Sequence, residues 1–290
     1  MPRPLPILAT LLALASVVSP QAAWAQGELR GGHFTTSDGV ELHYLEEGAG
    51  RTLVFVPGWT MPAWIWEPQL EHFAANHRVV ALDPRGQGRS EKPTHGYNPS
   101  RRARDICELL EHLGGEPAVV VGWSLAVQEV LLCAQEGATE AIRAAVLVDY
   151  EIVWENTEEL TPGFISLQTE REDWTRKFVE SIHLNPSEEY VEALTQAALK
   201  TPTNAAALML ANLILMGPTD LRPAVESFDR PVLFVYSSLD WAVAAAGVVR
   251  HEWPEVPVEV IEETSHALFV DKPDEFNRVL EVFLATLPQE

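Results

Sequence analysis

The sequence has few cysteines and few basic residues, and both shortages exclude classes of function. Its two cysteines, Cys107 and Cys133, lie far apart, and its 9 histidines are scattered. No cluster therefore has the spacing of a metal site. The 20 Lys and Arg residues are outnumbered by 42 Asp and Glu residues, which gives a formal net charge of -22. So acidic a chain will not bind nucleic acid or an anionic membrane through its general electrostatic field.

Glycine motifs for phosphate or dinucleotide binding are also missing, because no Walker-type or dinucleotide pattern follows a predicted strand. We therefore expect no cofactor. A long hydrophobic run is missing too. The apolar run near the start, residues 7–18, is shorter than the roughly 20 residues that a membrane span needs.

That short run predicts a leader peptide rather than an anchor. Arg3 precedes it, and Ala23-Trp24-Ala25 follows it as a cleavage site of the A-x-A kind. We expect residues 1–25 to be a signal peptide and the mature chain to begin at Gln26. Loss of Arg3, the only charged residue removed, takes the formal charge from -22 to -23. The predicted location is periplasmic or secreted, without a membrane anchor after cleavage.

The rest of the chain alternates between strand and helix patterns. A hydrophobic content of 47% in 290 residues suits one core, or one core with an inserted lid. Asp38-Gly39 predicts a hairpin near the start of this region. Strands alternating with helices imply a mostly parallel sheet covered on both faces, an α/β fold. The predicted strands are 53–56, 78–83, 118–122, 144–149 and one from 232, and the predicted helices are 66–75, 101–113, 125–136, 241–253 and 273–287.

The most informative stretch is Val119 to Ala126. A β-branched run ends in Gly-x-Ser-x-Ala, and a helical pattern follows at once. This predicts a nucleophile elbow, a strained turn that raises the Ser124 hydroxyl above the sheet. Gly122 and Ala126 flank the serine at two residues on either side, where only small residues fit.

Three further segments occur in the order that such a turn requires. A strand upstream ends in Pro57-Gly58-Trp59, the strand from Val232 leads to Asp240, and the strand 258–261 leads to His266. With the Asp83-Pro84-Arg85-Gly86-Gln87-Gly88-Arg89-Ser90 loop, the chain after about Gly32 resembles the α/β-hydrolase family, in particular its serine esterase and haloperoxidase-like members. The resemblance implies a mostly parallel central sheet flanked by helices, with an inserted helical cap.

The cap is expected where the alternation breaks, between about residues 150 and 221. Phe164, Leu167, Trp174, Phe178 and Ile182 have the spacing of one amphipathic helix, and residues 189–200 and 204–216 predict two more. The predicted organisation is a signal peptide at 1–25, a hydrolase core at 26–149 and 222–290, and a cap at 150–221.

The resemblance implies a Ser-His-acid triad. A serine hydroxyl needs a base within hydrogen-bond reach, and only His266 follows the last strand and precedes the last helix. Asp240 is the favoured acid, with Asp149 and Glu151 as alternatives because they follow the preceding sheet strand. The backbone N–H groups of Trp59 and Leu125 are the expected oxyanion donors. This family usually has His-Gly in the first of these loops, and here Pro57 stands in place of the histidine.

These residues predict a serine hydrolase of small ester or lactone bonds, with no metal and no cofactor. A carbon–carbon hydrolase or a perhydrolase-like relative is an alternative, and a non-catalytic binding protein on this scaffold is a third. Trp123, Trp154 and Trp241 are expected to line an apolar substrate pocket together with Trp59.

The two cysteines lie in helices that cover the same face of the sheet in this family. Two unpaired buried thiols are favoured over a disulfide, which an oxidising compartment would permit.

Overall fold

A computed structural model describes residues 30–216 and 219–288. The predicted signal peptide, and with it the predicted mature start, lies outside the described residues. Within the described ranges, no helix combines the length and the apolar character needed to cross a membrane.

Eight strands form one twisted sheet in the order β1-β2-β4-β3-β5-β6-β9-β10. Strand β2 pairs antiparallel with β1 and β4, and all the pairings from β4 to β10 are parallel. The predicted mostly parallel sheet is therefore confirmed. The strands are β1 (Gly31–Thr35), β2 (Glu41–Gly48), β3 (Thr52–Val56), β4 (Arg78–Leu82), β5 (Ala118–Trp123), β6 (Ile142–Val148), β9 (Val232–Ser237) and β10 (Val258–Ile261).

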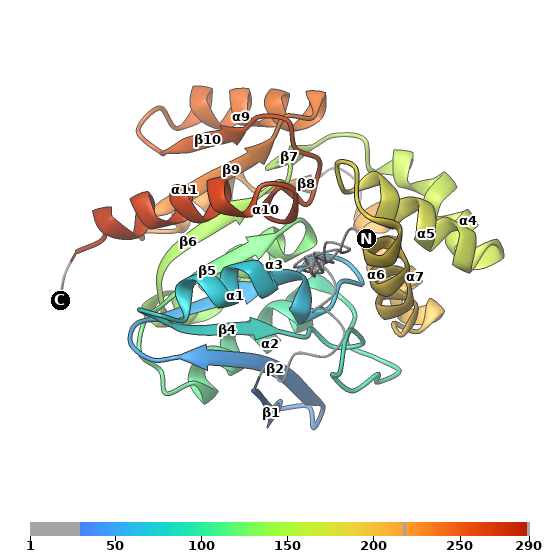
Figure 1. Ribbon diagram of the computed structural model, residues 1–290, viewed down its shortest axis with the longest axis horizontal. Coiled ribbons are helices and arrows are strands. Elements are labelled where there is room, and N and C mark those ends of the chain that lie inside the picture. The colour runs from blue at the N-terminus through green and yellow to red at the C-terminus, as the bar shows by residue number, and fades with distance from the viewer. Residues whose placement is uncertain (1–29, 217–218, 289–290) are drawn as a thin grey trace, which may run out of the picture.

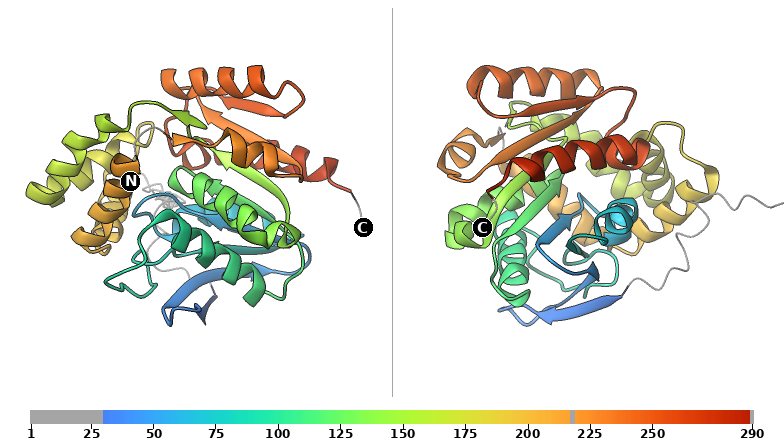
Figure 2. Two further views of the ribbon diagram at one scale, coloured as in Figure 1. Left: turned by 180° about the vertical axis from the view of Figure 1, so that it is seen from behind. Right: turned by 60° about the vertical axis from the view of Figure 1, so that its left-hand side comes forward.

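Helices cover both faces of this sheet, and each face has its own hydrophobic core (Figures 1 and 2). One face is covered by α2 (Pro99–His112), α3 (Leu125–Cys133), α8 (Arg222–Ser227) and α9 (Asp240–Glu252). The other is covered by α1 (Glu67–Phe73), α10 (Leu268–Asp271) and α11 (Pro273–Thr286). Central strands such as β5 are buried along their whole length, which explains their continuous apolar sequences.

Four helices, which we call the cap, lie together to one side of the sheet, at the right in Figure 1. They are α4 (Thr161–Thr169), α5 (Arg171–Ser181), α6 (Glu188–Leu199) and α7 (Thr203–Met216). The single amphipathic helix expected over residues 164–182 is in fact two helices. Glu170 interrupts it with a non-helical backbone (φ -136°, ψ 46°), although the apolar spacing continues across the break.

A two-stranded ribbon joins these helices to the sheet, and the sequence pattern did not predict it. Strand β7 (Val153–Trp154) pairs antiparallel with β8 (Thr219–Asp220). Each strand has two residues, which is too short for an alternating pattern to be visible. The ribbon brings the two ends of the helical segment together.

The two cysteines form a disulfide between α2 and the last residue of α3, with their Cα atoms 5.7 Å apart. The expectation of two unpaired thiols is therefore wrong. Facing helices on one side of the sheet bring the two Cα atoms within bonding range, and sequence spacing does not reveal that distance. The bridge ties the helix that follows Ser124 to its neighbour.

Candidate active site

Ser124 lies between β5 and α3 in a backbone conformation that few non-glycine residues adopt. Its φ is 56° and its ψ is -128°, which is the strained geometry of an elbow. The turn is closely packed: a Cβ added to Gly122 would lie 2.9 Å from Val130 Cγ2 and 3.0 Å from Ala126 O. The requirement for a small residue at position 122 is therefore physical, since any side chain there would push α3 away from the strand.

His266 lies in the loop between β10 and α10 and contacts Ser124 directly. Its Nε2 is 2.9 Å from Ser124 Oγ, and its Nδ1 is 2.8 Å from Asp149 Oδ2. The imidazole is 17% exposed, whereas the Asp149 side chain is fully buried. The ring is therefore placed between a hydroxyl that opens to the cavity and a carboxylate that solvent does not reach.

Asp149 follows β6 directly and receives several hydrogen bonds besides that of His266. Ser237, at the end of β9, donates its backbone N–H to Oδ1 at 2.7 Å and its hydroxyl to Oδ2 at 3.1 Å. These donors compensate a buried carboxylate for its lost hydration. The φ of Asp149 is 50°, a left-handed conformation that aspartate tolerates better than most residues.

Asp240, the acid favoured on sequence grounds, is not the partner of His266. It is the first residue of α9 and is exposed. Strand β9 ends at Ser237, and Asp240 begins the helix three residues later. The alternative acid Asp149 occupies that position instead. Glu151, the other alternative, is half-buried and lines the adjacent cavity.

That cavity, about 450 Å³ in volume, opens directly over Ser124 and His266. Its walls are mostly apolar. Besides Ser124, His266 and Asp149, it is lined by Trp59, Leu125, Tyr150, Glu151, Trp154, Glu159, Leu160, Phe178, Leu210, Leu213 and Trp241. A volume of this size with a few polar groups is typical of a small-molecule site.

Three of the four tryptophans expected in the pocket line this cavity, namely Trp59, Trp154 and Trp241. Trp123 does not. It is 1% exposed, donates its indole N–H to His266 O at 2.8 Å, and packs with its ring centroid 5.1 Å from that of Phe269. It supports the histidine loop from the core side. Its position in the buried strand β5 explains the difference, because its side chain points into the hydrophobic core between the sheet and helices α10 and α11.

The loop after β3 lies against Ser124. A Cβ added to Gly58 would be 2.9 Å from Ser124 Cβ, so only glycine fits this approach. Trp59 and Leu125, the residues expected to supply oxyanion donors, both line the cavity beside Ser124. The Trp59 side chain extends into the cap: its indole N–H donates to Ala206 O at 3.0 Å, and its ring meets that of Trp174 edge-on.

The polar end of the cavity is acidic. Glu151 and Glu159 both line it, and Glu159 accepts a 2.7 Å hydrogen bond from the Trp154 indole. Burial, and secondarily the charge of Glu159, raises the pKa of Glu151 above its ordinary value. No lysine or arginine is found among the described residues that line this cavity. A negatively charged ligand would therefore meet no compensating charge here.

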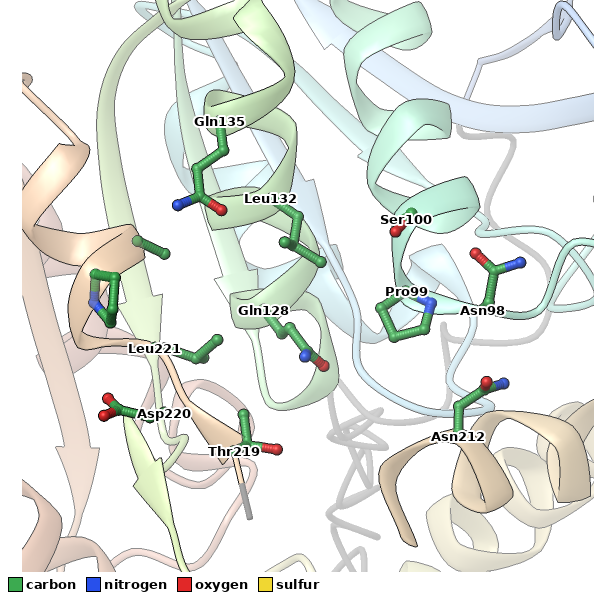
Figure 3. Close-up of a pocket in the computed structure, with 12 residues that line it drawn as sticks. Asn98, Pro99, Ser100, Gln128, Leu132, Gln135, Asn212, Thr219, Asp220 and Leu221 are labelled. Carbon is green, nitrogen blue, oxygen red and sulfur yellow. The ribbon is translucent and has the colours of Figure 1, made fainter. Parts of the chain in front are cut away.

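A second cavity, about 650 Å³, lies between the core helices and the end of the cap (Figure 3). Gln128 of α3, Asn98 before α2 and Asn212 of α7 line it, together with Thr219 and Asp220 of β8. None of Ser124, His266 and Asp149 lines it. Of these two cavities, Ser124 and His266 therefore open to the smaller one. Among residues 30–216 and 219–288, no group of His, Cys, Asp and Glu side chains is arranged to hold a metal ion.

Comparisons with known proteins agree with this fold. The model of the "Alpha/beta hydrolase family" matches residues 53–279. A pimeloyl-[acyl-carrier protein] methyl ester esterase from Pectobacterium atrosepticum is 26% identical over 83% of this chain and 98% of its own. A non-heme chloroperoxidase from Kitasatospora aureofaciens is 27% identical over 86% of this chain and 98% of its own.

Solved structures of esterases have the same fold. An esterase from Exiguobacterium antarcticum superposes with a TM-score of 0.81 at 19% identity, covering 89% of this chain and all of its own. An esterase from a Rhodococcus species superposes with a TM-score of 0.77 at 24% identity over 89% of this chain.

Proposed function

Because the chain belongs to the alpha/beta hydrolase family, we propose that it is an exported serine hydrolase of small ester or lactone bonds. The observation that carries the proposal is the hydrogen-bonded row Ser124–His266–Asp149, with distances of 2.9 Å and 2.8 Å, at the floor of an apolar cavity. Esterases among the relatives and structural neighbours support the same chemistry.

The reaction begins with attack of Ser124 Oγ on the carbonyl carbon of the ester. His266 Nε2 accepts the hydroxyl proton, and Asp149 stabilises the imidazolium through Nδ1. The carbonyl oxygen becomes an oxyanion, for which the backbone N–H groups of Trp59 and Leu125 are the proposed donors. As the tetrahedral intermediate collapses, His266 returns the proton to the leaving alcohol, and an acyl-Ser124 ester remains. Water, deprotonated by His266, then releases the acid and restores the serine.

The cavity favours a compact, neutral substrate. Its volume of about 450 Å³ and its tryptophan and leucine walls suit a short acyl or aryl group. Glu151 and Glu159 disfavour an anionic group at the polar end. We expect nitrophenyl esters from acetate to hexanoate to be hydrolysed faster than emulsified long-chain triglyceride, and the reverse order would contradict a covered cavity.

The disulfide supports the proposal of export, because such bonds persist in oxidising compartments. Expression of the full chain in a Gram-negative host, followed by intact-mass measurement, tests it. The exported protein should begin at Gln26. An exported form that retains Met1 would contradict cleavage.

Mutation of the nucleophile tests the mechanism. Ser124→Ala should abolish covalent labelling by a fluorophosphonate and lower ester turnover by several orders of magnitude. Full activity in that variant would refute the mechanism.

The chloroperoxidase relative makes perhydrolysis a second candidate. In that case hydrogen peroxide replaces water in the second step, and peracid formation from the same acyl-enzyme would distinguish it from hydrolysis alone.

A further inference from the structure

We propose that Gln87 is a positioning residue that holds the oxyanion loop in its working orientation, an inference that rests on the proposed function. The loop is the turn from Gly58 to Met61, which lies against Ser124. Where the family usually has a histidine before the glycine, this chain has Pro57, which has no side-chain donor. The support for the turn must therefore come from elsewhere.

Gln87 supplies that support from the loop between β4 and α2. Its Nε2 amide donates to Gly58 O at 3.0 Å and to Met61 O at 2.7 Å, so one amide group joins the two ends of the turn. The side chain is fully buried. Its Nε2 must face the two carbonyls, because the opposite amide orientation would place Oε1 against two acceptors.

The bond to Gly58 O fixes the direction of the Trp59 N–H. Both groups belong to the same peptide unit, and in a planar trans peptide the C=O and the N–H point in opposite directions. A carbonyl held toward Gln87 therefore keeps the Trp59 N–H directed away from Gln87. If this peptide rotated, the proposed oxyanion donor would be lost although no catalytic side chain had moved.

The turn needs such restraint because it is strained. Thr60 has a φ of 61°, an unfavourable conformation for a β-branched residue. Within the turn, Met61 N donates to Gly58 O over 3.3 Å, a long bond. The two bonds from Gln87 are the shorter ones. We infer that they, rather than the turn itself, keep the strained arrangement populated.

Gln87 is itself held in place by its own loop. Its backbone N–H donates to Pro84 O at 2.9 Å, and its carbonyl accepts from Ser90 N at 3.1 Å. The Ser90 hydroxyl in turn binds Asp83 O. Gln87 is therefore held at its backbone by its own loop and at its amide group by the oxyanion loop. A residue that positions another group must be fixed in this way.

The test replaces Gln87 with methionine, which has a similar length but no donor, and with glutamate, which has almost the same shape. The matched control is Gln69→Met. Gln69 is equally buried and also donates twice, but its bonds go to Phe269 O at 3.0 Å and Asn277 Oδ1 at 3.2 Å rather than to the oxyanion loop. Both methionine variants lose two buried hydrogen bonds, so a loss of general stability should be similar.

The readouts are kcat and KM for nitrophenyl butyrate, and the inhibition constant of a small aryl trifluoromethyl ketone, whose serine adduct carries an oxyanion. We expect Gln87→Met to lower kcat roughly 10- to 100-fold and to weaken ketone binding by a similar factor. KM should stay within about twofold. Gln69→Met should change kcat and ketone affinity by less than about twofold. Gln87→Glu should act in the same direction as Gln87→Met and gives the answer if the methionine variant does not fold.

The proposed role of Gln87 would be overturned if Gln87→Met and Gln69→Met had equal effects on kcat. It would also be overturned if both Gln87 variants had unchanged ketone affinity. The proposed function fails separately, if the wild-type protein neither hydrolyses esters nor reacts with a fluorophosphonate. That result would overturn both proposals, whereas an active wild type with unaffected Gln87 variants would overturn only the second.

Discussion

Replacing Asp149 with asparagine removes one charge and leaves the shape of the buried acid unchanged. The asparagine Oδ1 can still accept the 2.7 Å bond from Ser237 N. Its amide would then face His266 Nδ1 as a donor, so Nδ1 must become the acceptor and Nε2 must carry the proton. A protonated Nε2 cannot accept the proton of Ser124, and the base is lost by tautomer reversal.

The expected loss in kcat is on the order of 10⁴, or about 5 kcal/mol of activation free energy. Asparagine is the appropriate substitution because Asp149 has a φ of 50°. Asparagine tolerates this left-handed conformation, so the variant does not add backbone strain. Alanine would add strain and leave two donors of Ser237 without an acceptor, and its effect on activity would be confounded with unfolding.

The matched control is Asp240→Asn. It makes the same chemical change in an exposed acid at the start of α9, where loss of the charge costs about 0.3–1 kcal/mol of helix stability. The measurements are kcat for nitrophenyl butyrate and the rate of fluorophosphonate labelling, with thermal unfolding of both variants. If Asp240→Asn abolishes turnover and Asp149→Asn does not, the hydrogen bond from His266 to Asp149 is not the catalytic one.

Three further changes have definite expected outcomes. Gly58→Ala should lower kcat roughly 10- to 100-fold because the added Cβ would lie 2.9 Å from Ser124 Cβ. The control Gly247→Ala, whose added Cβ would point into open space, should leave kcat unchanged. Cys107→Ser should lower the free energy of unfolding by about 3–4 kcal/mol from the 26-residue separation, measured in urea, and reductant should have the same effect on the wild type but none on the variant. Substrate preference is measured as kcat/KM for nitrophenyl butyrate divided by kcat/KM for an anionic nitrophenyl hemisuccinate. Glu151→Gln should reduce this preference, whereas Glu155→Gln, outside the cavity lining, should leave it unchanged. Because the pKa of Glu151 is raised, lowering the pH should reduce the same preference in the wild type, at pH values where an ordinary glutamate is still charged, and should have less effect in Glu151→Gln.

The pairing of Ser124 with His266 could be predicted from the sequence because local rules determine their positions. Ser124 needs a buried strand, a small-residue turn and a helix, all within a few residues, and His266 needs only to follow the last strand. The sheet could be predicted for the same reason, since strands such as β5 are apolar throughout. Strand β7 and the break at Glu170 could not be predicted, because two-residue strands and a single non-helical residue leave the periodicity unchanged.

The acid could not be identified in this way, because two neighbouring strands deliver acids to the same edge of the sheet. Asp149 follows β6 and Asp240 follows β9, and these strands pair in parallel. Chain order admits both. The difference arises where each strand ends: Asp149 comes one residue after β6, beside Ser237, while Asp240 is already part of a helix. The position of a strand end within one or two residues is the feature that periodicity determines least well.

Gln87 shows why a missing motif residue need not mean a missing function. Pro57 stands where the family usually has a histidine, yet Gln87 makes two bonds to that loop, with partners 29 and 26 positions away in the sequence. No spacing rule joins such positions, because the parallel pairing of β3 with β4 brings their following loops together. A local motif predicts which side chain reacts. The residues that orient this side chain come from other loops, which the pairing of the strands brings next to the motif. In this chain both Asp149 and Gln87 belong to that second kind: the sequence offered Asp149 as one of three candidate acids and did not indicate Gln87, and the folded structure shows the contacts of both.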